Sequence, residues 1–316
     1  MSFTSEIKDE LVRIQNEQSC CDMAQLCGFI CFAGSVGYSG ETPYLKITTE
    51  SDAAAKSFET LMKKVFGIKD ELVKSQNSSG RGGFLYNYVL DTVGKVHQVL
   101  DALGLFDDEF SEHITFKINQ NLVKKQCCKR AFIRGAFLGG GSAANPEKSY
   151  HLEFVTHHHA LSGGLTEVFA YFDIDAKTVK RQSNYVIYFK NSDDIFDVMS
   201  VMGAHKKMME FANVRIVKDK RNNINRKVNC ETANLDKTLN AAFVQKEAIK
   251  KIKEAGKFEM LPKHLAEVAN MRLEHPDASL NALAELLGTK ISRSAINHRF
   301  KKIIQIAEEI TEKNNE

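Results

Sequence analysis

The chain contains one segment twice, as AQLCGFICFAGS at residues 24–35 and as RAFIRGAFLGGGS at residues 130–142. Each copy follows closely on a Cys-Cys pair and ends in Gly-Ser, and equivalent residues such as Gly28 and Gly135 are 107 positions apart. The same spacing relates YLKITT at 44–49 to HLEFVT at 151–156. A match at constant spacing over this length indicates one supersecondary unit used twice.

Both segments are predicted helices with small residues along one stripe, Ala24 and Gly28 in the first and Ala131, Gly135 and Gly139 in the second. A glycine inside a helix costs about 1 kcal/mol, so its recurrence four residues later needs a reason. We interpret it as the close approach of two helix backbones, although two independent helices that tolerate glycine are the alternative. The residues assigned to this helix packing are Gly28, Gly34, Gly135 and Gly141.

The sequence after each segment alternates between strand and helix patterns. Strands are predicted near 44–48, 84–90, 151–155 and 185–190, and an amphipathic helix is predicted between Ala54 and Val65. A closing helix ends near Leu103-Gly104 in the first copy and near Met202-Gly203 in the second. The predicted fold class is α+β, with a tandem, pseudo-symmetric α-β-β-α-β-β-α unit.

The composition is typical of a soluble globular protein. No apolar run approaches the roughly 18 residues that cross a bilayer, and the opening MSFTSEIKDELVRI is charged and helical in pattern. The seven cysteines lack the spacing of a disulfide framework, which favours a reducing cytoplasm. We therefore expect a cytoplasmic protein without a membrane partner.

The net charge of +3 hides an asymmetry along the chain. Residues 1–116 carry 10 Lys and Arg against 17 Asp and Glu, a net of −7, whereas residues 117–316 carry 33 against 23, a net of +10. Residues 117–316 are therefore predicted to bind a polyanion, whereas the first repeat is not an obvious nucleic-acid surface.

The two glycine-bearing helices, at 26–34 and 133–141, resemble degenerate LAGLIDADG motifs of homing endonucleases. The resemblance implies that the helices pack together and that their sheets form a saddle on DNA. It also implies a Mg²⁺-binding carboxylate before the final glycine of each motif, but these positions are Ala33 and Gly140. Since phosphodiester cleavage needs oxygen ligands for its metal, we predict no enzyme activity. Residual Mg²⁺-dependent cleavage, with Glu41 and Glu147 as substitutes from loops, is the remote alternative.

The segment 205–230 is basic, with eight Lys and Arg against Glu210 and Asp219. We predict auxiliary phosphate contacts here, with a plain solvated linker as the alternative. The residues assigned to these contacts are Lys218, Lys220, Arg221, Arg226 and Lys227. An amphipathic helix is predicted next, at 232–255, with these side chains turned inward: Leu235, Leu239, Ala242, Phe243, Ile249 and Ile252.

The remaining segment is predicted to fold as a helix-turn-helix. One helix starts near Pro262 and ends at His275-Pro276, a second runs from Ser279 to Gly288, and Ser292 caps a third. The second and third helices would share a core of Leu283, Leu287, Ile296 and Phe300 around the small Ala284. The turn Thr289-Lys290-Ile291 is longer than in the tightest versions and resembles the sigma-factor region 4 type.

The third helix is the predicted DNA-reading element, because residues 289–303 carry five Lys and Arg and no acid. Its first residues would contact base edges in the major groove, and its later residues would contact phosphates. The assigned residues are Ser292, Arg293, Ser294, Asn297, Arg299, Lys301 and Lys302. A helical hairpin with only a structural role is the alternative.

Taken along its whole length, the chain resembles the WhiA family of bacterial regulators. The resemblance is carried by RGAFLGGGSAANPEKSYHLEF at 134–154, RNNINRKVNCETANLDKT at 221–238 and LPKHLAEVANMRLEHPDASLNALAELL at 261–287. It implies a cytoplasmic, nucleoid-associated DNA-binding regulator, a transcription factor tied to cell division and chromosome segregation, and to sporulation in some relatives. A division-apparatus adaptor whose DNA binding is incidental is the alternative.

The expected domains are repeat 1 at 1–116, repeat 2 at 117–204, the basic connector at 205–230 and a helical DNA-binding domain at 231–316. Within the last, the helix-turn-helix spans 278–303. The expected partner is double-stranded DNA, with division or transcription proteins as further candidates, and the internal pseudo-symmetry is compatible with a monomer. If the repeats touch DNA, the candidates are Lys180, Arg181 and Lys190 of the second copy.

Two metal-site interpretations are disfavoured by residue spacing. Cys20, Cys21, Cys27 and Cys31 contain no C-x2-C pair, and adjacent cysteines point their side chains apart, so buried free thiols are expected instead of zinc ligands. Three consecutive histidines at 157–159 cannot face one ion on a strand or a helix. We therefore predict no metal and no cofactor.

Overall fold

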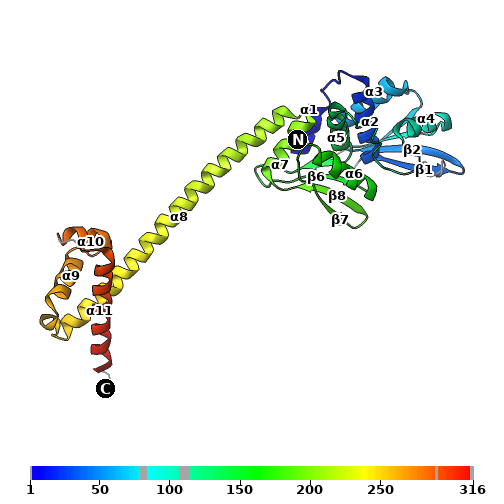
Figure 1. Cartoon of the computed structure of the whole chain (residues 1–316). Helices are drawn as coiled ribbons and strands as arrows, with labels where there is room; N and C mark the ends of the chain where they lie inside the picture. The colour runs from blue at the N-terminus through cyan, green and yellow to red at the C-terminus, as the bar shows by residue number, and fades with distance from the viewer. Residues whose placement is uncertain (1, 79–83, 107–113, 289–290, 314–316) are drawn as a thin grey trace. The chain divides into compact units, whose positions relative to one another are not determined.

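The computed structural model describes residues 2–78, 84–106, 114–288 and 291–313. The chain forms two compact units, Met1–Lys218 and Asp219–Glu316, and each has a buried core (Figure 1). The boundary falls inside one long helix, α8 (His205–Glu254), which starts in the first unit and ends in the second. Within the described part of the chain, no helix is both long and apolar enough to cross a membrane.

The first unit uses the same order of elements twice, which confirms the predicted fold class. After a short helix, α1 (Phe3–Leu11), the first copy comprises α2 (Ser19–Ala33), β1 (Gly34–Ser39), β2 (Thr42–Thr49), α3 (Asp52–Phe66), β3 (Leu72–Ser78), β4 (Phe84–Leu90) and α4 (Val93–Leu103). The second copy comprises α5 (Gln126–Gly140), β5 (Gly141–Ala143), β6 (Leu152–Thr156), α6 (His159–Ala170), β7 (Lys177–Arg181), β8 (Asn184–Phe189) and α7 (Ser192–Met202).

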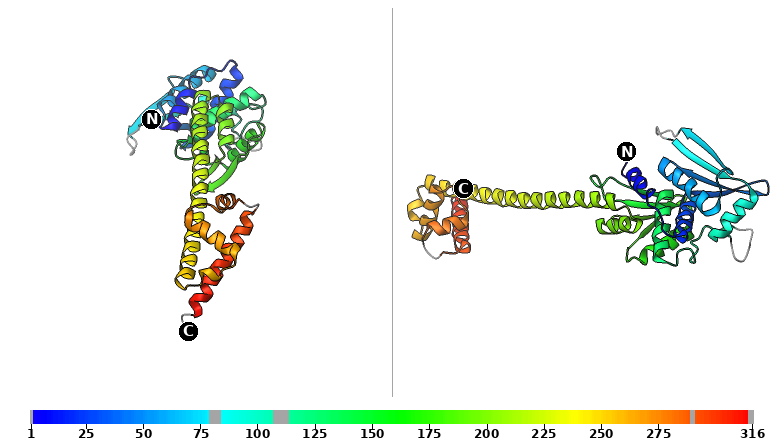
Figure 2. Two further views of the ribbon diagram at one scale, coloured as in Figure 1. Left: turned by 90° about the vertical axis from the view of Figure 1, so that its left-hand side faces the viewer. Right: turned by 90° about the horizontal axis from the view of Figure 1, so that it is seen from above.

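Each copy builds one antiparallel four-stranded sheet, in the order β1-β2-β4-β3 and β5-β6-β8-β7. Along β2 every second residue from Pro43 to Thr49 is buried, and β6 follows the same alternation. This is the pattern of a sheet with one face on the core and the other open. The helices that cover the sheets can be followed in Figures 1 and 2.

Helices α2 and α5 pack directly against each other. A Cβ atom at Gly28 would lie 2.2 Å from the carbonyl oxygen of Phe132, and one at Gly135 would lie 1.9 Å from that of Gln25. The two backbones approach this closely because neither helix carries a side chain at the crossing.

Gly34 and Gly141 occupy a different environment from the one predicted for them. Each is the first residue of a strand, β1 or β5, and a Cβ atom there would meet its own preceding helix, at Ile30 or Phe137. Their small size therefore allows the chain to turn from helix into strand, whereas the helix crossing depends on Gly28 and Gly135.

The second unit is helical. The end of α8 is followed by a single 3₁₀ turn, η1 (Phe258–Met260), and then by α9 (Lys263–Glu274), α10 (Leu280–Leu286) and α11 (Arg293–Lys313). The side chains of Ser279 and Ser292 accept hydrogen bonds from Ala282 N and Ala295 N, so both serine caps are confirmed. Gly288 ends α10 with a left-handed φ of 61°, while the next two residues of the predicted turn, Thr289 and Lys290, lie outside the described residues.

The predicted core of the helix-turn-helix is confirmed. Leu283, Ile296 and Phe300 are buried, and Ala284 and Leu287 pack against them. The buried residues of α11 continue at Ile303, Ala307 and Ile310, at helical spacing.

The basic segment 205–230 is helical throughout, and the helix predicted to begin at 232 begins at His205. Ala242, Ile249 and Ile252 are buried as predicted, but Leu235, Leu239 and Phe243 are 58%, 39% and 61% exposed. The expectation that they point inward was wrong because the second core reaches α8 only from about Ala242 onward.

Candidate nucleic-acid interface

The first half of α11 exposes a row of polar and basic side chains. Arg293, Ser294 and Asn297 are exposed, as are Lys301 and Lys302 one turn later. They stand clear of the core because Ile296, Phe300 and Ile303 occupy the buried face of the same helix. The cap from Ser292 fixes where this helix starts.

Arg299 differs from the other residues assigned to DNA reading. It is half-buried, and its Nη1 lies 3.4 Å from the carbonyl oxygen of His264 in α9. Arg299 thus reaches toward α9, and its assignment to DNA reading stays a prediction.

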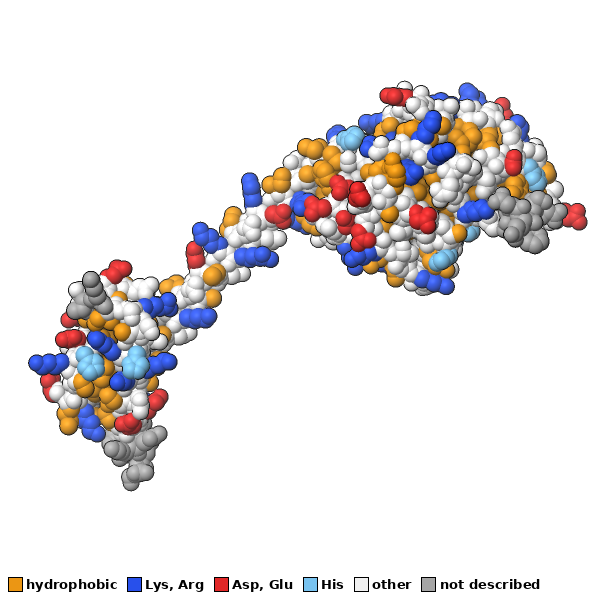
Figure 3. All heavy atoms as spheres, in the orientation of Figure 1, with side chains coloured by type: hydrophobic (Ala, Val, Ile, Leu, Met, Phe, Trp, Pro, Cys, Tyr) orange, Lys and Arg blue, Asp and Glu red, His pale blue; other side chains and the backbone are white. Residues whose placement is uncertain are grey.

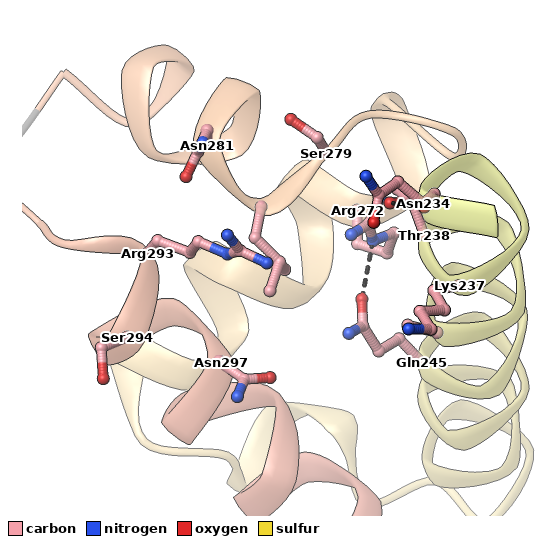
Figure 4. A pocket seen from close by; sticks show the side chains of 12 residues that line it. Asn234, Lys237, Thr238, Gln245, Arg272, Ser279, Asn281, Arg293, Ser294 and Asn297 are labelled. Carbon is pink, nitrogen blue, oxygen red and sulfur yellow. Dashed lines mark hydrogen bonds between the residues drawn. The ribbon is translucent and has the colours of Figure 1, made fainter. Parts of the chain in front are cut away.

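A hollow of about 650 Å³ lies on one flank of α11, inside the second unit. Figure 4 shows Arg293 and Asn297 on this side of α11, facing Lys237 and Gln245 of α8. Its lining is rich in amides, hydroxyls and cations, including Asn234, Thr238, Ser279 and Asn281. Such donors and acceptors match phosphate oxygens and base edges.

A second hollow, of about 470 Å³, lies on the other flank and is lined by His264, His298 and Lys302 among others. Ser294 borders both hollows, so the start of α11 forms a ridge between them. Among the residues that the structure describes, none that lines either hollow is acidic. A protruding helix with cations and amides on both flanks is the shape and chemistry that enter a major groove.

Arg272 holds the helices around this ridge together. It is 1% exposed, its Nε donates to Gln245 Oε1 at 3.0 Å, and its Nη1 donates to the carbonyl oxygen of Ala278 at 2.6 Å. Its guanidinium also lies 5.3 Å from the centre of the Phe300 ring, and burial lowers its pKa. One side chain thus connects α8, the loop before α10, and α11.

Sequence reasoning did not single out Arg272, although a signal exists. Leu265, Val268 and Ala269 form the buried face of α9, and Arg272 occupies the next position of that face. An arginine at an apolar-face position indicates a buried, hydrogen-bonded guanidinium, which here positions the helices around it.

Four of the five residues predicted to contact phosphates are exposed on α8: Lys220, Arg221, Arg226 and Lys227. The fifth, Lys218, belongs to the first unit, where its ammonium lies 4.9 Å from the centre of the Tyr150 ring. Lys218 is therefore already engaged with the repeat domain.

The helical form of α8 divides the four exposed cations among its faces. A helix advances about 100° per residue, so residues seven apart lie within about 20° of each other. Lys220 and Lys227 therefore share a face with Asn234 and Ala241, two residues that line the larger hollow beside α11. Arg221 and Arg226 lie on other faces, each about 100° away from its neighbouring lysine.

The positions that carry carboxylates in LAGLIDADG nucleases do not suit Mg²⁺ here. Beside Gly140 lies a hollow of about 510 Å³ whose lining includes Lys8 and a single carboxylate, Glu50. Lys8 Nζ donates to the carbonyl oxygen of Leu138 at 3.0 Å, at the last turn of α5, and burial lowers its pKa to about 8. An ammonium ion at this point repels a divalent cation, so the donor set does not fit the nuclease metal.

The other residues of the first unit that were predicted as metal ligands or DNA contacts lie apart from one another. Glu41 and Glu147 lie in turns, and on the second sheet Lys180 and Lys190 lie over the rings of Tyr185 and Tyr188. Arg181 is 3.5 Å from Glu153. On the face of this unit seen in Figure 3, acidic side chains lie among the basic ones.

Comparisons with known proteins agree with this description. Three family models match: the WhiA N-terminal LAGLIDADG-like domain at residues 19–106, the WhiA LAGLIDADG-like domain at 129–221 and the WhiA C-terminal HTH domain at 224–307. A relative from Alkaliphilus metalliredigens is 43% identical over 312 residues, 98% of both chains, and one from Clostridium botulinum (strain Eklund 17B / Type B) is 38% identical over 311 residues, 98% of this chain and 99% of the relative. Both relatives are named probable cell division protein WhiA.

A solved structure extends the likeness to three dimensions. The crystal structure of full-length WhiA from Thermatoga maritima has a TM-score of 0.57 and 25% identity, with 98% of this chain and 99% of that chain covered. The resemblance inferred from the sequence is thus confirmed, and the chain belongs to the WhiA family, with two LAGLIDADG-like domains and a C-terminal helix-turn-helix domain.

Proposed function

We propose that this chain is a sequence-directed DNA-binding regulator that acts in cell division and chromosome segregation. The observation that carries the proposal is the ridge formed by the start of α11, where Arg293, Ser294 and Asn297 are exposed. The described residues that line the hollows on its two flanks include no acid. The link to cell division is supported by the names of the relatives.

Each exposed residue of the ridge matches a component of double-stranded DNA. Arginine pairs through two hydrogen bonds with guanine, asparagine pairs in the same way with adenine, and serine bonds to bases or phosphates. Arg293 and Asn297 are therefore the proposed base readers, one turn apart on the same side of α11. Lys301 and Lys302 follow one turn later as phosphate contacts.

A second set of phosphate contacts is proposed on α8. Lys220 and Lys227 lie on the helix face that leads to the hollow beside α11, so DNA seated on the ridge can pass along them. The repeats are proposed to serve as a scaffold without nuclease activity, because Ala33 and Gly140 supply no carboxylate and Lys8 lies beside Gly140.

The test is the selection of genomic fragments by the purified full chain at about 150 mM salt, where nonspecific phosphate binding is weak. The chain should enrich a shared motif, and Arg293→Ala with Asn297→Ala should abolish the enrichment. Removal of each base-reading side chain should cost about 1–3 kcal/mol on the preferred site. Lys251→Ala is the control, since Lys251 is exposed on α8 but borders neither hollow.

Two results would refute the proposal. The first is that neither the native chain nor the double variant enriches a shared DNA motif. This result would favour a division adaptor with incidental DNA binding, and proteins that bind the repeats would be sought next. Nicking of supercoiled plasmid that depends on Mg²⁺ and stops with EDTA would instead restore the nuclease alternative.

A further inference from the structure

Four cysteines that are far apart in the sequence come together in the first unit. The sulfur atoms of Cys20, Cys21, Cys127 and Cys128 all lie within 4.8 Å of one another. Cys21 and Cys128 are buried, Cys20 is half-buried and Cys127 is exposed, so the cluster is accessible from one side. The other buried pair, Cys27 and Cys31, belongs to the core of α2.

The cluster follows the internal symmetry of the repeats. Cys20 and Cys21 are the second and third residues of α2, and Cys127 and Cys128 are the second and third residues of α5. Each helix thus presents its pair at the same point, and the four thiols meet across the repeats. Two pairs related in this way can surround one central point.

The distances between the four sulfur atoms fit a single metal ion. Zinc–thiolate bonds of about 2.3 Å place the four sulfur atoms of a regular tetrahedron about 3.8 Å apart. The Cys127 and Cys128 sulfur atoms are already 4.0 Å apart, so small side-chain movements would complete the tetrahedron. A four-iron cluster would need wider spacing, because each thiolate binds a different iron.

The position of the thiols favours negatively charged sulfur. The thiols lie in the first turns of two helices, where the backbone N–H groups and the helix dipoles stabilise anions. A bound cation would replace the protons of these thiols.

We propose that Cys20, Cys21, Cys127 and Cys128 bind one thiophilic divalent cation, zinc, in a closed tetrahedral site that ties together the N-termini of α2 and α5. Four thiols release four protons to solvent and bind one Zn²⁺ as thiolates, which leaves a complex with a net charge of −2. Four protein ligands leave no open position, so the site is structural and takes no part in catalysis. Cys20 and Cys21 lack zinc-ligand spacing within their own helix, and their partners Cys127 and Cys128 lie 107 residues away in the sequence.

The first experiment uses the full chain, purified under reducing conditions without chelator. Elemental analysis by mass spectrometry should find one zinc per chain. Replacement of zinc by Co²⁺ should produce the intense visible absorption of cobalt in a tetrahedral thiolate site. This spectrum reports the ligands of the native chain, so it does not depend on any variant being able to fold.

The variants separate this cluster from the other thiols. Cys20→Ser with Cys127→Ser removes one ligand from each helix at the two more accessible positions and should abolish stoichiometric zinc and the cobalt spectrum. Cys230→Ser, an exposed cysteine outside the cluster, should leave both unchanged.

Two outcomes would overturn the proposal. One is a freshly reduced chain, with all four thiols titratable, that takes up neither Zn²⁺ nor Co²⁺. The other is a cytoplasmically expressed chain in which peptide mass spectrometry finds disulfides between Cys21 and Cys127 or between Cys20 and Cys128, since oxidised thiols cannot hold the ion.

Discussion

Lys8 places a buried positive charge at the end of one of the two motif helices. It is 9% exposed, and its ammonium donates to the last turn of α5, where the carbonyl ends of the helix favour a positive charge. LAGLIDADG nucleases place carboxylates and a metal ion at this end of the motif helices. Here a side chain of α1 supplies a positive charge at this end of α5.

Burial of Lys8 should make stability depend on pH. Its pKa falls from 10.5 to about 8 on folding, so between those values the unfolded chain binds more protons than the folded chain. The free energy of unfolding should therefore rise from pH 8 to pH 10.5, by about 3 kcal/mol from this group. Lys8→Met should lack this rise, and urea unfolding at several pH values measures it.

The matched control for Lys8 is Lys69→Met, which removes an exposed lysine of the same unit. This variant should keep the pH dependence of the native chain. The prediction fails if the difference in unfolding free energy between Lys8→Met and the native chain stays constant from pH 8 to pH 10.5. Lys8 would then have the same pKa in the folded and unfolded chains.

Among the helices, the α2–α5 crossing is the most sensitive to side-chain size. Gly135→Ala would place a methyl group 1.9 Å from the backbone oxygen of Gln25, and a backbone atom cannot move aside as a side-chain end can. We expect a loss of about 3 kcal/mol or more, the upper end for an overpacked core. The denaturant midpoint of the repeats, followed by hydrogen exchange in α2 and α5, measures it.

Gly163→Ala is the matched control for this prediction. Gly163 also lies within a helix, α6, but a Cβ atom there meets nothing within 4 Å. The substitution should be neutral or should stabilise the chain by up to about 1 kcal/mol, because alanine favours the helix. Equal effects of the two substitutions would contradict the close approach of α2 and α5.

Most elements of this chain follow from its sequence. The repeat, the glycine stripe and the strand alternation predicted α2, α5, β2 and β6, and the two serine caps located α10 and α11. The start of α8 was missed because the asparagines and charges of 205–230 are typical of a loop, although no proline or glycine interrupts the helix there. Leu235 and Phe243 were misjudged because helical spacing predicts a face but not what covers it.

The faces of α8 predict how its cations contribute to DNA binding. The logarithm of the DNA-binding constant should fall less steeply with the logarithm of salt concentration in Lys220→Ala with Lys227→Ala. The slope should change by about 0.9 for each phosphate that is no longer neutralised, and the change should be the same for every DNA sequence. Arg221→Ala with Arg226→Ala removes the same charge from other faces and should leave the slope nearly unchanged. Binding isotherms at several salt concentrations measure both. Identical slopes for the two variants would contradict a DNA path along one face.

For the whole molecule, the two cores stabilise different parts of the structure. The first core fixes the arrangement of the repeats, and the second fixes the ridge of α11 through Phe300 and Arg272. The helix-turn-helix could be predicted from local sequence because its residues lie within about 30 positions of one another. The four-cysteine cluster could not, because its two pairs lie 107 positions apart and meet only after folding. The position of Arg272 on the apolar face of α9 indicates its burial but not its partner, Gln245 of α8.

Since the two cores share no buried residue, damage to one should stay within its unit. Phe169→Ala in the first core and Phe300→Ala in the second each remove a fully buried ring and should cost about 3–5 kcal/mol. Hydrogen exchange should rise in α5 to α7 for Phe169→Ala and in α9 to α11 for Phe300→Ala, with the other unit unchanged. Specific DNA binding should be lost only with Phe300→Ala. If either substitution raised exchange in both units equally, the chain would unfold as one cooperative body, and α8 would transmit stability between its two ends.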